Sequence, residues 1–208
     1  EQGHITAQFN LGEKYDLGKG VPEDDKEAVK WFRRAAERGH EKAQAYLGWM
    51  YDKGRGVPED NEEAVKWYKR AAEQENAAAQ VNLGRMYTKG EGVPKDHKKA
   101  VKWYRRAAEQ GHANTQFYLG RMYDKGRGVP IDVQESVWWF RRATEQGHAT
   151  AQFYLGVRYA SGRAVPKDVQ EAVKWYTRAA EQGHAKAQLY LGAIYDQGKG
   201  VPKDDKEA

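Results

Sequence analysis

The sequence predicts an all-α solenoid in which helix-turn-helix units of 36 residues stack along the chain. Three observations predict this fold: one pattern recurs at a fixed offset, its apolar residues follow helical spacing, and glycine with proline interrupts it at regular places. Such an array buries its apolar surface between neighbouring units, because one pair of helices cannot cover both of its own faces.

The repeat is defined by positions that match at every interval of 36 residues. A Leu-Gly pair recurs without insertion or deletion, at Leu11-Gly12, Leu47-Gly48, Leu83-Gly84, Leu119-Gly120, Leu155-Gly156 and Leu191-Gly192. Tryptophan recurs at the same offset, at Trp31, Trp67, Trp103, Trp139 and Trp175. We therefore expect residues 1–208 to form a single array of about 5.5 repeats, with partial repeats at both ends, as in a fragment of a longer array.

The first helix of a unit, helix A, is predicted between Glu41 and Lys53, where apolar residues follow one another at spacings of three and four. Gly54 is expected to stop this helix in the left-handed conformation. Gly56-Val57-Pro58 then forms a turn that cannot continue the helix, and its valine is expected to fill the core.

The second helix, helix B, is predicted from Asp60 to about Gln74. Asp60 can cap its first turn, with Glu63 completing a capping-box arrangement. The equivalent pairs are Asp24 with Glu27, Asp132 with Glu135 and Asp168 with Glu171, whereas Asp96 is followed by Lys99. Gly-His follows helix B in most units. By this register Glu1–His4 is expected to end one helix B, and Ala208 to lie where another opens.

Composition narrows the classes of partner. Lys and Arg number 35 against 30 Asp and Glu, and the resulting charge of +5 is spread along the chain, which disfavours nucleic acid and membrane surfaces. The absence of cysteine excludes disulfides and cysteine-ligated metals. No apolar run approaches the roughly 18–20 residues that span a bilayer. We expect a soluble protein of unassigned compartment, with the bacterial envelope, secretion and the cytoplasm all open.

Three motifs carry a family resemblance: A-x-x-x-L-G-x-x-Y, then G-x-G-V-P-x-D, then A-V-x-W-Y/F-x-R-A-A-E-x-G. Together they resemble the Sel-one-like repeat family, relatives of tetratricopeptide repeats, over the whole chain. The resemblance implies a right-handed α-solenoid with A helices on the concave face and B helices on the convex face. It also implies an adaptor or scaffold in protein complexes, including signalling complexes. The departures are Glu75-Asn76 for Gly-His, Ala164 for the loop glycine, Ser136 and Thr144 for alanine, and Trp138 for lysine.

Partner contacts are expected on helix A, at positions that differ between units and lie opposite the core stripe. The predicted contact residues on this concave face are Lys42, Tyr46, Trp49, Asn82, Arg85, Tyr118, Arg121 and Tyr154. Aromatic residues and arginine are enriched at protein interfaces. The tyrosines that recur at one repeat position fit packing between units equally well.

Helix B offers one candidate contact residue. Trp138 stands where other units have lysine, and it either covers a neighbouring helix or marks a contact site on the convex face. Basic pairs such as Arg33-Arg34 lie close to glutamates on the same helix, and their spacing favours salt-bridged solvent faces over a strip that binds RNA or a membrane.

Metal binding and catalysis are both disfavoured. Equivalent histidines, at His4, His40, His112, His148 and His184, lie about 10 Å apart in stacked units and cannot share one zinc ion. We expect them to be turn residues, as Asn76 at the same position indicates. Ser136 and Ser161 lack an accompanying His and carboxylate. The sequence therefore predicts no enzyme activity, no catalytic residue, no metal and no cofactor.

The predicted function is that of a scaffold that binds a protein or peptide on the concave helix A face. Alternatives are a self-associating assembly and the recognition module of a larger, even enzymatic, protein. Capture of a partner's terminal carboxylate by Lys42, Asn82 and Arg85 is a weaker alternative, because these residues do not reproduce the known clamp pattern.

Overall fold

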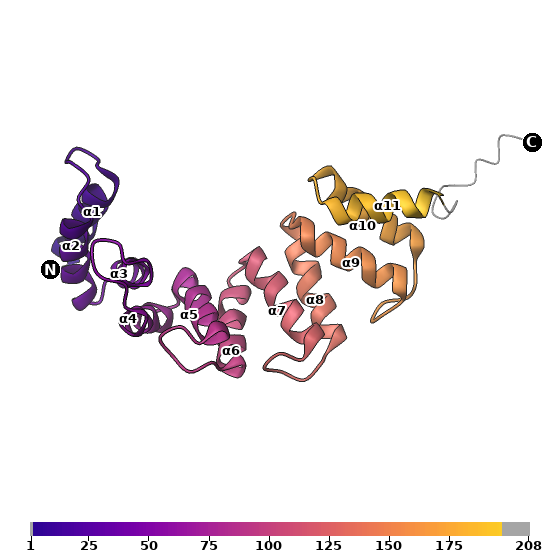
Figure 1. The fold of residues 1–208 in the computed structure, drawn as a ribbon, viewed down its shortest axis with the longest axis horizontal. Coiled ribbons are helices and arrows are strands. Elements are labelled where there is room, and N and C mark those ends of the chain that lie inside the picture. Colours follow the sequence, from indigo (N-terminus) through magenta and orange to yellow (C-terminus); the bar gives the residue numbers. More distant parts are fainter. Residues whose placement is uncertain (1, 197–208) are drawn as a thin grey trace, which may run out of the picture. The chain divides into compact units, whose positions relative to one another are not determined.

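The computed structural model describes residues 2–196, with side chains from His4 onward, and every regular element in that range is an α-helix. Odd-numbered helices are the A helices and even-numbered helices the B helices (Figure 1). Their bounds are α1 Gln2–Leu17, α2 Asp25–Glu37, α3 Glu41–Lys53, α4 Asn61–Glu73, α5 Ala77–Lys89, α6 His97–Glu109, α7 Ala113–Lys125, α8 Val133–Glu145, α9 Ala149–Ser161, α10 Val169–Glu181 and α11 Ala185–Asp196. The all-α prediction with a 36-residue alternation of two helices is confirmed.

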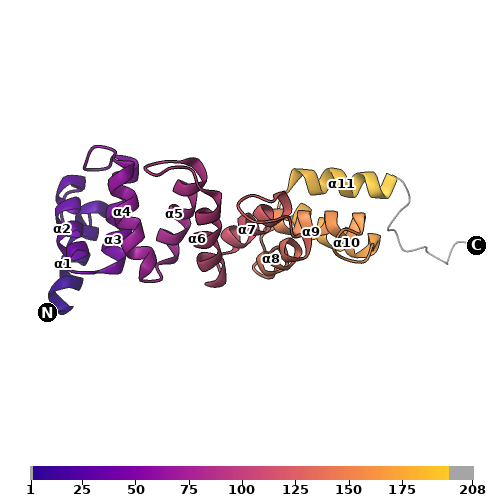
Figure 2. The ribbon, with the colours of Figure 1, turned by 90° about the horizontal axis from the view of Figure 1, so that it is seen from below.

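The chain divides into two compact units, residues 1–110 and 111–208. Unit 1 contains α1–α6 and unit 2 contains α7–α11. Within each unit a helix packs mainly on the helices that precede and follow it in the sequence, as the two views show (Figures 1 and 2). This nearest-neighbour packing is typical of repeat proteins. That residues 1–208 form a single array stays a prediction.

Helix A ends where the glycine pattern predicts. Gly54 caps α3 with a φ of 63°, and the Arg55 amide donates to the Met50 carbonyl at 2.9 Å. A glycine without Cβ enters this left-handed region at little cost, so the helix stops and the chain turns back. Val57 in the following loop packs against the core, as predicted.

Helix B is capped by its aspartate, although not through a complete capping box. The Asp60 carboxylate accepts from the Glu63 amide at 2.9 Å, but the Asp60 amide donates to the Tyr51 carbonyl at 3.0 Å. Glu63 instead pairs with Lys66. The predicted reciprocal bond is therefore wrong, because the loop-closing bond already uses that donor. The same reason explains why Asp96, without a following glutamate, still caps α6.

The register of the first residues also differs from the prediction. Gln2–His4 belong to α1 and do not form the end of a helix B followed by a turn. Elsewhere this turn is held by a carbonyl of the preceding helix B, as when the His40 amide donates to the Ala35 carbonyl at 3.0 Å.

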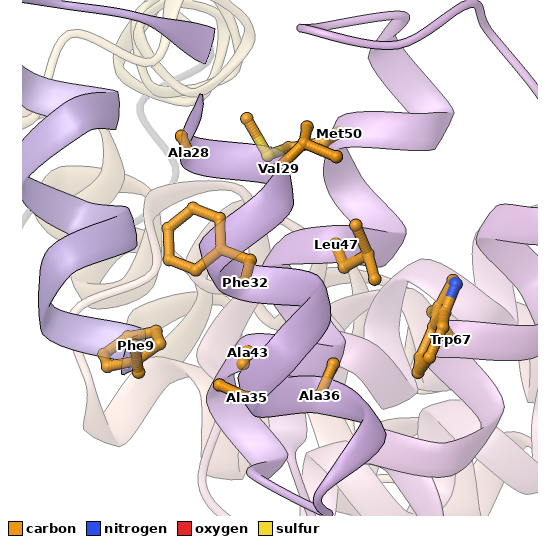
Figure 3. Close-up of a cluster of buried hydrophobic side chains, with 10 residues drawn as sticks. All are labelled: Phe9, Ala28, Val29, Phe32, Ala35, Ala36, Ala43, Leu47, Met50 and Trp67. Atoms are coloured by element: carbon orange, nitrogen blue, oxygen red, sulfur yellow. The ribbon is translucent and has the colours of Figure 1, made fainter. Parts of the chain in front are cut away.

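At five of the Leu-Gly glycines the repeat is closed by an aromatic ring that lies on the glycine. A Cβ at Gly12 would lie 2.6 Å from the ring of Phe32, a distance that no side chain tolerates. The same contact recurs at Gly48 with Tyr68, Gly84 with Tyr104, Gly120 with Phe140 and Gly156 with Tyr176. Trp67 of α4 then joins the cluster built from Phe32 and Leu47, so the core continues from one repeat into the next (Figure 3).

Glutamines add a polar tie between consecutive repeats. The Gln74 amide nitrogen donates to Oε1 of Gln44 at 2.7 Å, and the Gln44 amide nitrogen donates to the Ala36 carbonyl at 3.0 Å. Three further pairs repeat the first bond, namely Gln110 with Gln80, Gln146 with Gln116 and Gln182 with Gln152. Because Gln44 is buried, these bonds satisfy groups that would otherwise be costly to bury.

Candidate functional site

The predicted contact residues on helix A include exposed side chains and side chains held by a neighbouring repeat. Lys42 on α3 is exposed, and 58% of Tyr118 on α7 is accessible to solvent. Asn82 on α5 is half-buried at the position that Tyr118 occupies on α7. The exposed members can meet a partner without any rearrangement.

The recurring tyrosines pack on the preceding repeat. Tyr46 stacks on Phe32 with centroids 5.2 Å apart and meets the edge of Phe9 at 5.8 Å. Tyr154 makes the same pair of contacts in unit 2, with both partner rings at 5.6 Å. These rings therefore stabilise the stack, while 38% of Tyr46 stays exposed and could also contact a partner.

Arg85 is held by carboxylates. Its Nη2 lies 2.7 Å from Oδ1 of Asp52, a buried residue on α3, and its Nη1 pairs with Glu91. Arg85 thus ties α5 to the preceding helix A, and a partner carboxylate would compete with Asp52 for it.

Arg121 is held by an aromatic side chain. Its Nη1 donates to the Tyr154 hydroxyl at 2.6 Å, and its guanidinium lies 4.7 Å from the centroid of that ring. The pair joins α7 to α9 within unit 2, so any role of Arg121 in binding would come in addition to this contact.

Trp49 is half-buried between two core clusters, one built around Leu47 and one around Leu83. The Arg55 guanidinium lies 5.6 Å from the centroid of the indole. Trp49 is thus a packing residue between α3 and α5 that leaves part of its ring accessible.

Two hollows lie between consecutive A helices of unit 1. The first, of about 360 Å³, is lined by Thr6, Phe9 and Asn10 of α1 and by His40, Glu41 and Lys42 at the start of α3. The second, of about 300 Å³, is lined by Asp52, Lys53, Glu59, Asn61, Arg85, Lys89 and Glu91. The α1 residues are absent from the predicted set, although Asn10 occupies the same repeat position as Tyr46 and could have been found by that comparison.

His40, His148 and His184 cap a helix A through a side-chain nitrogen, whereas His112 makes no side-chain capping bond. Nδ1 of His40 accepts from the Ala43 amide at 3.2 Å, and its ring stacks on Phe9 at 4.6 Å. His148 makes the equivalent bond at 3.1 Å, and Asn76 makes it through its side-chain oxygen at 2.9 Å. Burial lowers the pKa of His40 and of His148. In residues 2–196 no group of His, Asp and Glu is placed to hold a metal ion.

Neither serine has the surroundings of a nucleophile. Ser136 is buried inside α8. The Ser161 hydroxyl donates to the Val157 carbonyl at 2.8 Å, as a helix residue bonding to its own preceding turn does.

Trp138 is the most exposed tryptophan that the structure describes, with 45% of its surface accessible to solvent. Its ring meets Trp139 edge-on at 4.4 Å, and the guanidinium of Arg142 lies 4.9 Å from its centroid. The arginines of other B helices stack in a similar way on tryptophan, as Arg70 does on Trp67 at 4.5 Å. These arginines thus stack on aromatic rings, whereas salt bridges with glutamates of the same helix were predicted.

The model of the Sel1 repeat matches six consecutive segments of the sequence, residues 5–40, 41–76, 77–112, 113–148, 149–184 and 185–208. The chain belongs to the Sel1 repeat family. Proteins of this family mediate protein–protein interactions, and their fold is typical of non-enzymatic scaffolds.

Solved structures agree with this assignment of a Sel1 repeat fold. A Sel1 repeat protein from Oxalobacter formigenes is 39% identical, with 98% of this chain and 83% of that chain covered and a TM-score of 0.80. A protective antigen of uropathogenic Escherichia coli is 36% identical, with 99% of this chain and 52% of that chain covered and a TM-score of 0.60. An immunity protein from Pseudomonas aeruginosa, 22% identical over 88% of this chain and 68% of that chain with a TM-score of 0.50, shares the fold alone.

Two further findings concern this Sel1 repeat chain. No protein with a curated description matches it. Among the helices described between residues 2 and 196, none combines the length and the apolar character that crossing a membrane requires.

Proposed function

We propose that this chain is a scaffold that binds a protein or an extended peptide on its helix A face. The hollow between α1 and α3 carries the proposal, because it combines the buried ring of Phe9 with the charged side chains of Glu41 and Lys42. Pockets that join an apolar surface to a few polar groups are suited to orient a bound segment.

The exposed tyrosines support the same face. Tyr46 lies on α3, the helix that also supplies Lys42, and Tyr118 lies at the equivalent position of α7. Tyrosine provides a large contact area with few rotatable bonds, which lowers the entropic cost of binding. Because Arg85, Arg121 and Trp49 also hold the repeats together, we place the binding energy chiefly on Lys42, Tyr46 and Tyr118.

The test uses photo-activated cross-linking residues placed at positions 42 and 118, with position 69 on α4 as the matched control. Lys69 is exposed on a B helix. We expect cross-links to a protein from position 42 in unit 1 or from position 118 in unit 2, and none from position 69.

The affinity of the chain for that purified protein then tests whether the helix A face binds it. In the unit that cross-links, Lys42→Glu (unit 1) or Tyr118→Ala (unit 2) should weaken binding at least tenfold, as the loss of an interface charge or aromatic side chain can do. Lys69→Glu should leave the affinity unchanged. Equal affinities for all variants, or cross-links from position 69 alone, would exclude the helix A face.

Self-association stays a second hypothesis, which light scattering over a range of concentrations tests. That the chain is the recognition module of a larger protein stays a hypothesis.

A further inference from the structure

One B helix differs from the others at two positions at once. Position 131, just before α8, and position 138 within it carry isoleucine and tryptophan. The equivalent residues of the other repeats are all charged, namely Glu23 with Lys30, Glu59 with Lys66, Lys95 with Lys102 and Lys167 with Lys174. Two charged positions have therefore become apolar in the same repeat.

Both apolar side chains are directed to solvent. Ile131 is 63% exposed and Trp138 is 45% exposed. The core position of α8 is taken by Trp139, which is 1% exposed and donates from Nε1 to Glu135 at 3.1 Å. Packing of the repeat thus explains Trp139 and leaves Trp138 without a role in the core.

The loop contact of Ile131 does not account for its identity. The Cγ1 atom of Ile131 approaches Gly126, where a Cβ would lie 2.8 Å away. The equivalent residues Glu59 and Lys95 place their own Cβ atoms beside Gly54 and Gly90 in the same way, at 3.3 Å. A charged side chain therefore serves the loop equally well, and the branched apolar end of Ile131 is left for another contact.

The charged group that lies over Trp138 is a guanidinium, whereas the Glu135 carboxylate, one helical turn away, accepts a hydrogen bond from Trp139. The Arg142 guanidinium lies over the exposed Trp138, 4.9 Å from the ring centroid. In repeat 3 the equivalent Arg106 pairs with Glu75, whereas Arg142 pairs with no carboxylate of the described residues. A guanidinium next to an exposed indole is suited to bind a carboxylate through two parallel hydrogen bonds while an apolar side chain covers the ring.

We propose that Ile131, Trp138 and Arg142 form a second docking site, on the helix B side of unit 2, for an acidic amphipathic segment of a partner protein. Apolar side chains of that segment cover Ile131 and Trp138, and an aspartate or glutamate pairs with Arg142. A second copy of the chain fits less well, because a two-fold contact would bring two Arg142 guanidinium groups together. This site is independent of the helix A face.

The probe is a display library of 16-residue peptides that carry leucine or phenylalanine at helical spacing, with either glutamate or lysine at the remaining positions. We expect the chain to enrich the glutamate series at least tenfold over the lysine series. A selected peptide is then synthesised with a fluorescent label, and its Kd is measured by polarisation.

Substitutions inside and outside the site test the assignment. Trp138→Lys introduces the residue of four other repeats, so the fold should be kept, and the Kd should rise at least tenfold. Arg142→Glu should make the chain prefer the lysine series over the glutamate series. If this variant does not fold, Arg142→Gln is used in its place. Lys174→Ala, at the position equivalent to Trp138 in the next repeat, should leave the Kd unchanged. Tyr118→Ala should also leave it unchanged, which separates this site from the helix A face.

Several outcomes would overturn the proposal. They are the absence of enrichment, enrichment that Trp138→Lys retains, and peptide binding that Tyr118→Ala removes. A dimer in light scattering that Trp138→Lys dissociates would assign the patch to a second copy instead. Binding to phosphatidylserine vesicles that Trp138→Lys abolishes would assign it to a membrane surface.

Discussion

Ala164 occupies a backbone position that glycine holds in other loops. Its φ is 68°, close to the 70° of the equivalent Gly56, and this left-handed conformation costs a residue with a Cβ about 1 kcal/mol or more. We predict that Ala164→Gly stabilises the protein by roughly 0.5–1 kcal/mol, because relief of strain exceeds the entropy that glycine adds to the unfolded chain. Urea denaturation followed by circular dichroism measures the change.

The reverse substitution provides the control. A Cβ at Gly56 would lie 2.3 Å from the Asp25 carbonyl oxygen, so Gly56→Ala should destabilise by more than Ala164→Gly stabilises. A loss of stability in Ala164→Gly would show that the alanine side chain contributes packing that outweighs its strain.

The histidine caps make stability depend on pH. Burial lowers the pKa of His40 and His148 below the ordinary value of about 6.5, so the unfolded chain binds protons more readily than the folded one. The free energy of unfolding should therefore fall as the pH is lowered through 6.5 toward the folded-state pKa values. Protonation also removes the Nδ1 acceptor that receives the Ala43 amide.

Asparagine is the natural replacement, since Asn76 makes the same cap. The double variant His40→Asn with His148→Asn should lose part of the fall in unfolding free energy between pH 7 and pH 5. Urea denaturation at several pH values measures this difference. Identical pH profiles for the variant and the parent chain would contradict the assignment.

Some contacts of single side chains could not be predicted from the sequence. The repeat pattern predicted that Tyr46 and Tyr154 face away from the Leu-Gly stripe. It did not show whether these tyrosines pack against the preceding repeat or are exposed to solvent. That decision depends on Phe9 and Phe117 in the preceding repeat, which are close in space but 37 residues away in the sequence. The pairing of Arg85 with Asp52 is hidden for the same reason.

At the scale of an element, a buried ion pair joins α7 to α9. Arg158 pairs with Asp124, and their side chains are 7% and 4% exposed. Equivalent positions hold methionine in other repeats, as at Met50 and Met122, so Arg158 replaces a core residue. Removing Arg158 leaves the buried Asp124 carboxylate with only the more distant ammonium of Lys125, at 3.5 Å. We predict that Arg158→Met destabilises by about 3–5 kcal/mol.

A compensating substitution tests this account. Position 88, equivalent to Asp124, is threonine in repeat 3. The double variant Arg158→Met with Asp124→Thr should recover stability to within about 1 kcal/mol of the parent, because a buried pair is often replaced at little cost. A double-mutant cycle from denaturation curves measures the coupling. Additive effects of the two substitutions would show that the pair is not coupled.

Helix boundaries were predictable because their signals are local. The glycine that ends helix A and the aspartate that starts helix B act within a few residues, and both predictions hold for α3 and α4. The partner of the Asp60 amide was not predictable, because Tyr51 belongs to the preceding helix.

At the scale of the whole molecule, the fold and the candidate function depend on different positions of the repeat. Positions that recur every 36 residues specify the helices, the ring on each Leu-Gly glycine and the glutamine bonds. Positions that break the period hold several of the candidate contacts, among them Lys42 and the Ile131–Trp138 pair. A single sequence identifies such positions but not a partner, because a partner is recognised through side chains that the fold does not require.

Nearest-neighbour packing also predicts how the chain tolerates truncation. Unit 1 is compact, and its last helix, α6, places Tyr104 on Gly84. We predict that a fragment of residues 1–110 is helical and unfolds cooperatively, whereas a fragment of residues 1–96, which lacks α6, is less stable by several kcal/mol because the apolar side of α5 loses its cover. Thermal unfolding followed by circular dichroism compares the two. An unfolded 1–110 fragment, or equal stability of both, would show that unit 1 depends on contacts beyond its own repeats.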